Sequence, residues 1–257
     1  MIELHPGSYR DPSGFIFRRD GRLLRQVNNR YASAFETLIG SGLYSELVGD
    51  GLLVRHETVD RALAATPDAY RVIEPERIPF VSQPREWCPS QVRDAALLTL
   101  RVLERALAHG MVLKDASAHN VQFIGTRAIF IDSLSFEPYS PGQTWVAYRQ
   151  FCESFLAPLA LARHVDSGLL GLQAQYPDGI PLKLASRTLP KTTFCRPSLL
   201  LHLHLHALSI DRYANAELNS HRWNRSIPKR ALEGLTQNLL AAIERLVWQP
   251  RASEWSS

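Results

Sequence analysis

The chain has 257 residues, of which 45% are hydrophobic and 21% charged, and its formal net charge is +4. This length and composition are typical of a globular protein that buries a sizeable core, as one two-lobed domain or as two small domains. The small positive excess is scattered, so it favours anionic ligands and gives no indication of a nucleic-acid partner.

The three cysteines, Cys88, Cys152 and Cys195, are far apart and odd in number. Such spacing predicts free thiols in a reducing compartment rather than disulfides or a metal cluster. The first residues contain no apolar run typical of a signal peptide, and no segment is long enough to span a bilayer. The sequence therefore predicts a cytoplasmic protein with no membrane partner.

The first third of the chain predicts a small β-rich lobe over residues 1–82. Residues 14–27 form two apolar runs around an Asp-Gly pair, which supplies the positive φ angles of a tight hairpin turn. A helix is expected over residues 31–40, with glycines as its terminators. Further strands are expected at 52–57, 70–73 and 78–82, although Pro79 restricts the last of these to an edge or a strand start.

The rest of the chain predicts a larger helical lobe. Residues 83–89 are polar and bounded by prolines, and we expect them to form the hinge. Ser90 is expected to cap a long helix that ends near Gly110 and has a broad apolar face. Within the helical lobe, residues 90–257, further helices are expected at 144–161, 196–213 and 228–247. The prediction is thus an α+β, two-lobed fold.

A motif follows the long helix directly. Asp115 precedes Asn120 by five residues, and Asp132 comes twelve residues after Asn120, at the end of an apolar segment. Phosphoryl-transfer sites of the protein-kinase type have this arrangement. In them the first Asp orients the acceptor hydroxyl, while the Asn and the second Asp hold the metal that bridges the nucleotide phosphates. The spacing predicts a protein-kinase-like fold.

The residues around the motif depart from the usual kinase pattern. Leu113 and Lys114 stand where His and Arg usually precede the first Asp, and Ser133 stands where Phe follows the second, with no Gly after it. The core spacing is kept while the flanking residues differ. We therefore expect a distant, atypical member of the kinase-like fold.

Each motif residue has a predicted role. Asp115 is the expected base that orients the acceptor, with a helix-capping or turn-stabilising role as the alternative. Asn120 and Asp132 are the expected Mg²⁺ ligands, because a hairpin around Gly125 would return Asp132 close to Asn120. Lys114 is expected to neutralise the transferring phosphate.

Nucleotide binding also requires a cation from the sheet, paired with a helix carboxylate. Arg25 on the second hairpin strand and Glu36 on the following helix are the pair that the positions favour. Arg in place of Lys keeps the charge but presents a planar fork. The alternative is an ordinary surface ion pair. A phosphate-covering loop over residues 6–14 is indicated only weakly, because its glycines lack the G-x-G-x-x-G spacing.

Two further features allow more than one interpretation. Alternate histidines at His202, His204 and His206 would share one face of a strand and suggest a metal site. On the expected helix only His202 and His206 share a face, which favours a structural or substrate-lining role. Arg149, in an aromatic segment near the site, could pair with a loop carboxylate or contact substrate.

Three stretches, residues 115–120, 130–137 and 145–152, resemble the N-terminal half of nodulation-protein NoeA-like proteins. That family is commonly labelled class I SAM-dependent methyltransferase, and a methyltransferase domain typically follows the resembling region. No glycine-rich SAM-binding strand-turn-helix is visible in this chain. The resemblance therefore implies a kinase-like domain with a methyltransferase domain as a partner in trans.

The favoured hypothesis is an ATP- and Mg²⁺-dependent kinase-like transferase that moves a phosphoryl group, or alternatively a nucleotidyl group, to a hydroxyl acceptor. A catalytically silent pseudokinase that serves as a binding or regulatory module for a methyltransferase is the main alternative. The altered flanks of the motif and the irregular glycine loop favour that alternative. A methyltransferase activity of these residues is disfavoured, because the SAM motif is absent.

Overall fold

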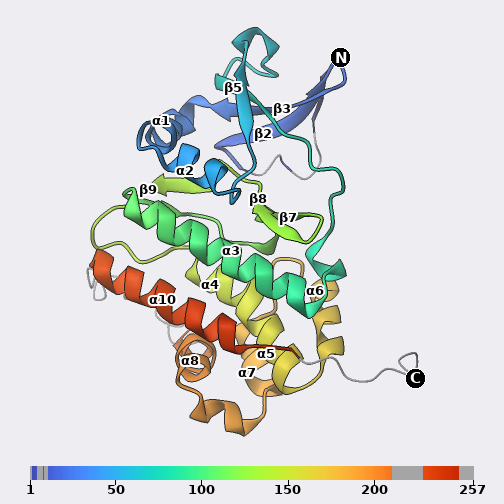
Figure 1. Ribbon diagram of the computed structural model, residues 1–257, viewed down its shortest axis with the longest axis vertical. Helices are drawn as coiled ribbons and strands as arrows, with labels where there is room; N and C mark the ends of the chain where they lie inside the picture. Colours follow the sequence, from blue (N-terminus) through green and yellow to red (C-terminus); the bar gives the residue numbers. More distant parts are fainter. Residues whose placement is uncertain (1, 5–7, 9–10, 210–227, 249–257) are drawn as a thin grey trace, which may run out of the picture.

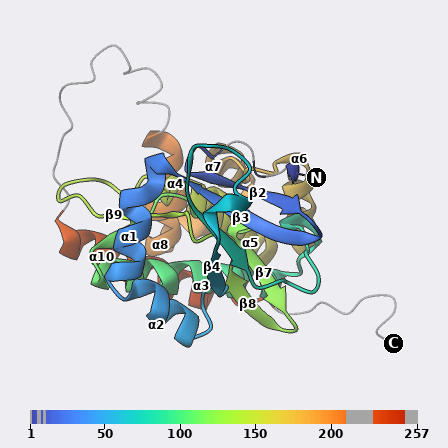
Figure 2. The same cartoon turned by 90° about the horizontal axis from the view of Figure 1, so that it is seen from above.

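The computed structural model describes residues 2–4, 8, 11–209 and 228–248. A small sheet-containing lobe lies at one end of the molecule and a larger helical lobe at the other (Figure 1). Figure 2 looks down onto the sheet and shows helices α1 and α2 along one side of it. Among the described residues, no helix combines the length and the apolar character needed to cross a membrane.

The small lobe is built on a five-stranded antiparallel sheet in the order β1-β2-β3-β5-β4. The predicted hairpin is confirmed, because β2 and β3 pair around a turn in which Asp20 and Gly21 have φ angles of 51° and 77°. The five strands are Ile2–Leu4 (β1), Gly14–Arg19 (β2), Arg22–Asn28 (β3), His56–Val59 (β4) and Ala69–Pro75 (β5).

The predicted helix is confirmed as α1, Ala32–Gly40, and is followed by α2, Leu43–Gly49. Two strand predictions need correction. The predicted strand at 52–57 forms only from His56, as part of β4, whereas its first half contacts the other lobe, where Leu52 and Val54 exchange backbone hydrogen bonds with Phe130, both at 2.8 Å. The predicted strand at 78–82 is wrong: Pro79 lacks an N–H, and the segment is an exposed connection in which Phe80 is 73% exposed.

The chain passes between the lobes through residues 76–88, which include a 3₁₀ turn, Pro84–Glu86. The long helix is confirmed as α3, Pro89–Ala108, but it begins two residues earlier than expected. Cys88 rather than Ser90 occupies the N-cap position, and its backbone N–H donates to Oε1 of Gln91 at 3.0 Å. Proline in the first helical turn loses no hydrogen bond, which explains the earlier start.

The helical lobe packs around α3. Helix α10, Lys229–Arg245, confirms the last predicted helix and lies along α3 (Figure 1). The helix predicted at 144–161 begins four residues later than expected. A second helix was predicted at 196–213, and its residues 210–213 lie outside the described residues. The other helices are α4, Tyr148–Phe151; a π-helical turn, Cys152–Leu156; α5, Ala157–His164; α6, Leu172–Gln175; α7, Leu182–Thr188; α8, Pro197–Leu199; and a second π-helical turn, Leu200–Leu205.

Four short strands between α3 and α4 complete the fold. Strand β6, Met111–Leu113, pairs with β9, Phe136–Pro138, while β7, Val121–Ile124, forms a hairpin with β8, Arg127–Phe130. The order of sheet, single connection, long helix, loop, hairpin and helices is that of a two-lobed protein-kinase-like fold. The predicted α+β fold class is confirmed.

A buried histidine makes the small lobe sensitive to acid. The ring of His56 lies 4.4 Å from that of Tyr44 and 5.9 Å from that of Phe35, and His56 is only 9% exposed. Burial, with a smaller contribution from the charge of Arg25, lowers the pKa of His56 from 6.5 to about 4. The histidine is therefore neutral in the folded protein at neutral pH.

We predict that replacing His56 with Phe removes part of the acid sensitivity of the fold. Between pH 6.5 and 4 the unfolded chain binds a proton at His56 that the folded protein does not, so the free energy of unfolding falls as the pH falls. One such group contributes up to about 1.4 kcal/mol per pH unit. Urea denaturation at several pH values should give a shallower slope for His56→Phe, and equal slopes would contradict the assignment.

Candidate functional site

Backbone hydrogen bonds bring the motif residues together. The β7–β8 hairpin turns at Gly125, which has a φ angle of 62°, and returns the chain so that the N–H of Ile131 donates to the C=O of Asn120 at 2.8 Å. The N–H of Lys114 donates to the C=O of Ser135 at 2.8 Å. The hairpin predicted around Gly125 is confirmed, and it places the loop after β6 beside the turn that follows β8.

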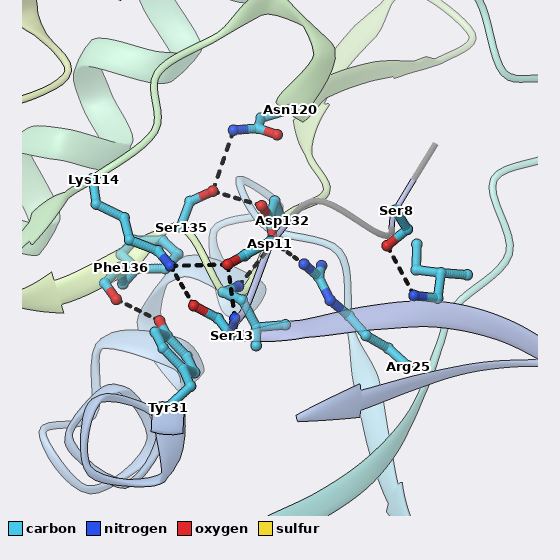
Figure 3. A network of polar contacts seen from close by, with 12 residues as sticks. Ser8, Asp11, Ser13, Arg25, Tyr31, Lys114, Asn120, Asp132, Ser135 and Phe136 are labelled. Atoms are coloured by element: carbon cyan, nitrogen blue, oxygen red, sulfur yellow. Dashed lines mark hydrogen bonds and ion pairs between the residues drawn. The ribbon is translucent and has the colours of Figure 1, made fainter. Parts of the chain in front are cut away.

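Asp132 is the most heavily bonded of the predicted site residues. Its Oδ1 accepts from Nη2 of Arg25 at 2.5 Å and from the backbone N–H of Leu134 at 2.9 Å, and its Oδ2 accepts from the hydroxyl of Ser135 at 2.7 Å (Figure 3). The side chains of Arg25 and Asp132 are 9% and 17% exposed. Burial alone raises the pKa of Asp132, but the Arg25 charge and these hydrogen bonds outweigh it and hold that pKa below its usual value.

Asn120 is linked to Asp132 through a shared serine. The Nδ2 of Asn120 donates to the Oγ of Ser135 at 3.2 Å, and that hydroxyl in turn donates to Asp132 (Figure 3). Asn120 is 8% exposed, and within the described residues its Oδ1 makes no hydrogen bond. The two predicted metal ligands therefore lie next to each other, with one amide oxygen free to bind.

Lys114 reaches from the loop into the other lobe. Its ammonium donates to the Oγ of Ser13 at 2.6 Å, lies 3.6 Å from Oδ1 of Asp11, and is 5.0 Å from the centre of the Tyr31 ring (Figure 3). The Tyr31 hydroxyl donates to the C=O of Phe136, which adds another contact between the lobes. Much of the loop over residues 6–14 lies outside the described residues, but Asp11 and Ser13 show that its end contacts the site.

Asp115 lies in the same loop and makes few contacts. Its Oδ1 accepts from the backbone N–H of Ser117 at 2.9 Å, which is the turn-stabilising role that the sequence left open. Its Oδ2 makes no hydrogen bond to any described residue. One oxygen thus orients the side chain while the other remains available, so the turn role and a role towards substrate are compatible.

The expected ion pair between Arg25 and Glu36 is wrong. Arg25 pairs with Asp132, whereas Glu36 accepts from the Tyr70 hydroxyl at 2.6 Å and lies 3.6 Å from Nη2 of Arg71. Glu36 is on the solvent side of α1 and is 53% exposed, because Phe35 and Leu38 form the buried face of that helix. In addition, the Nε of Arg25 is buried and has no partner among the described residues.

Several residues that hold the site were not recognised in the sequence. The indole N–H of Trp145 donates to the C=O of Leu113 at 2.8 Å, and the backbone N–H of Ala116 donates to Oε1 of Gln150 at 2.8 Å. These contacts fix the loop on both sides of Lys114 and Asp115. Arg149, for which the sequence left open a loop carboxylate or a substrate, pairs with Glu153 four residues further along the chain at 3.0 Å. Ser13 is 101 residues from Lys114, and no local pattern connects them.

The three histidines have structural surroundings. His202 is bonded to the Tyr148 hydroxyl and to Asn238, at 2.7 and 2.8 Å, and the ring of His206 stacks on Tyr148. The predicted shared face of His202 and His206 is therefore confirmed, while His204 bonds to Ser186 and Thr193. Within the part of the chain that the structure describes, no three His, Cys, Asp or Glu residues are grouped as a metal site.

Comparisons with known proteins agree with the sequence resemblance. No protein-family model matches the chain. Nodulation protein NoeA of Rhizobium meliloti (strain 1021) is 32% identical to it over an alignment of 260 residues that covers 96% of this chain. The chain spans 54%, about half, of the length of that relative. The predicted resemblance to NoeA-like proteins is confirmed over nearly the whole chain.

One solved kinase structure is similar to this chain. Vaccinia related kinase 3 matches with a TM-score of 0.42 and 12% identity, over 96% of this chain and 88% of that one. At this score the likeness adds nothing to the fold assignment, which depends on the order and pairing of the elements described above.

We predict strong energetic coupling between Arg25 and Asp132. Replacing Arg25 with Met leaves a largely buried carboxylate without its counter-ion, and breaking such a pair costs about 3 kcal/mol. The double variant Arg25→Met, Asp132→Asn should cost clearly less than the sum of the single changes, as measured by chemical denaturation. The exposed pair Glu36–Arg71 is the matched control and should show coupling below about 1 kcal/mol. Additive costs at Arg25 and Asp132 would contradict the prediction.

Proposed function

We propose that this chain is a kinase-like transferase domain that binds ATP with Mg²⁺ between its lobes and transfers the phosphoryl group to a hydroxyl acceptor. One observation carries the proposal. The buried Arg25 of the sheet forms an ion pair with Asp132, and Ser135 links Asp132 to Asn120 by hydrogen bonds. The Nε–H of Arg25 has no partner among the described residues. The charges, donors and oxygens that phosphoryl transfer uses are thus in one network.

Arg25 and Lys114 would bind the phosphates. A buried N–H without a partner costs stability, so the Nε of Arg25 favours a ligand that carries acceptor oxygens. Phosphate oxygens accept strongly from guanidinium groups. Lys114 approaches from the opposite lobe with an ammonium whose present partners are a hydroxyl and a carboxylate 3.6 Å away. A phosphate between the lobes would meet positive charge from both sides.

Asn120 and Asp132 would hold the metal. Mg²⁺ is commonly held in proteins by one or two carboxylates together with substrate phosphates and water. Asn120 provides a free Oδ1. Asp132 provides a carboxylate that Arg25 keeps ionised, and the Oδ2 of that carboxylate accepts only one hydrogen bond among the described residues. These two side chains therefore fit the one or two protein ligands that Mg²⁺ commonly takes. When bound, Mg²⁺ supplies positive charge that neutralises the transferring phosphate.

Asp115 would act on the acceptor. One of its oxygens is fixed by the Ser117 N–H, and the loop on either side is held by Trp145 and Gln150. The other oxygen would accept the proton of an acceptor hydroxyl, orienting that hydroxyl toward the phosphate. A carboxylate held on one side only can turn its free oxygen toward a substrate without losing its position. A nucleotidyl transfer would use the same groups on a different phosphate.

A specific observation favours a second candidate function. The guanidinium of Arg25 lies 2.5 Å from Oδ1 of Asp132, so it already neutralises the carboxylate that a metal would need. A site whose carboxylate is neutralised in this way suits a domain that binds its partner or ligand but does not catalyse transfer. Such a pseudokinase would serve as a binding or regulatory module for a methyltransferase acting in trans, in keeping with the chain's similarity to about half of a longer protein.

We predict that ATP raises the thermal midpoint of this protein only in the presence of Mg²⁺ or Mn²⁺. A ligand at a hundredfold excess over its dissociation constant adds about 2.7 kcal/mol of stability. Asp132→Ala and Asn120→Ala should each abolish the metal-dependent part of the shift, whereas Asp94→Ala on the exposed side of α3 should keep it. A full metal-dependent shift in Asp132→Ala would exclude Asp132 as a ligand.

A second prediction distinguishes the transferase from the silent module. Asp115→Ala should leave ATP affinity nearly unchanged and lower turnover about 10²- to 10⁴-fold, because orienting a hydroxyl contributes mainly in the transition state. ATP consumption would be measured with mixtures of small-molecule and protein acceptors, for the wild type beside the variant. Negligible turnover in both, together with tight ATP binding, would favour the regulatory module. Loss of ATP binding in Asp115→Ala would instead show that this residue is structural.

A further inference from the structure

The ammonium of Lys114 already has an anion beside it. Oδ1 of Asp11 lies 3.6 Å from Nζ of Lys114, and the same ammonium donates to the Oγ of Ser13 at 2.6 Å (Figure 3). Asp11 and Ser13 come just before β2 in the small lobe, whereas Lys114 follows β6 in the large one. The cation proposed to meet a nucleotide phosphate is therefore already paired with a carboxylate of the same chain.

The carboxylate of Asp11 is held in this position by the backbone that follows it. Its Oδ1 accepts from the N–H of Ser13 at 2.8 Å, and the C=O of Asp11 accepts from the N–H of Gly14 at 3.3 Å. An Asp whose side chain bonds the N–H two residues further on forms an Asx turn. Ser13 is itself buried and bonded to Lys114. Asp11 therefore faces Lys114 from a fixed turn.

A phosphate and the Asp11 carboxylate would compete for the same ammonium. The side chains of Asp11 and Lys114 are 33% and 25% exposed, so their pair is partly shielded from water. Like charges only a few ångströms apart repel each other more strongly in such a place than in bulk water. A phosphate oxygen at hydrogen-bond distance from Lys114 would lie close to Oδ1 of Asp11. A bound phosphate must therefore displace the carboxylate or bind against its repulsion.

We propose that Asp11 is an internal competitor of the nucleotide: it pairs with Lys114 when no phosphate is bound, and it thereby sets the affinity of the site for phosphate groups. That the competing ligand is ATP rests on the proposed function. The competition itself applies to any small molecule that carries phosphate groups, so pyrophosphate measures it without a nucleoside. Neutralising Asp11 removes both the competing ion pair and the repulsion.

The test compares phosphate binding by the wild type and Asp11→Asn. Asn keeps the Oδ1 that accepts from Ser13 and favours the same turn, but it removes the charge. Calorimetric titration of the full chain with pyrophosphate, and separately with ATP and Mg²⁺, should show binding about tenfold tighter in Asp11→Asn. Asp60→Asn is the matched control and should bind as the wild type does. Oδ1 of Asp60 accepts from the N–H of Ala62 at the same 2.8 Å, just after the edge strand β4.

A second pair of variants tests whether the effect passes through Lys114. In a Lys114→Gln background the ammonium that Asp11 contacts is gone, so Asp11→Asn should tighten pyrophosphate binding much less than it does in the wild type. An equal gain in both backgrounds would overturn the proposal, because Asp11 would then act only as a nearby charge. The thermal midpoint of Asp11→Asn without ligand should be nearly unchanged, since a partly exposed ion pair contributes little stability.

The outcomes also separate this proposal from the proposed function. Equal affinities of the wild type and Asp11→Asn for both probes would show that Asp11 only links the lobes, and would overturn the competition without touching the transferase. Tighter pyrophosphate binding by Asp11→Asn, with no binding of ATP to either protein, would support the competition and count against the transferase. Binding of neither probe to any of the variants would overturn both.

Discussion

The ion pair between Arg25 and Asp132 is the constraint on which the arrangement of this molecule depends. It joins the middle of the sheet to the turn after β8, so the two lobes share a largely buried pair of charges. Removing charges from water is costly unless they are paired and hydrogen-bonded. Asp132 meets this requirement with the Leu134 N–H and the Ser135 hydroxyl. The contact between the lobes at this point therefore depends on the ionisation of one carboxylate.

The same pair defines what the site can do. A guanidinium that neutralises Asp132 can give up part of its contact when phosphate oxygens approach, or it can remain as a permanent substitute for a metal. The first possibility corresponds to the transferase and the second to the silent module. The unpaired Nε of Arg25 favours the transferase, because a buried N–H without an acceptor costs stability that a purely structural cluster would avoid.

The loop that carries Lys114 and Asp115 is held from several directions. Trp145 and Gln150 bind its backbone from the helical lobe, while Lys114 itself reaches Ser13 at the start of the sheet.

The sequence by itself determined the elements whose signals are local. The Asp-Gly turn predicted the β2–β3 hairpin, apolar periodicity predicted α1, α3 and α10, and the spacing of Asp115, Asn120 and Asp132 predicted that these residues belong together. Only the tertiary structure decided which charges pair. Arg25 meets Asp132 instead of Glu36, and Lys114 meets Ser13, because the packing of one lobe against the other sets those distances. Contacts between residues about a hundred positions apart leave no periodic trace in a single sequence, and the buried, unpaired Nε of Arg25 becomes visible only once its neighbours are in place.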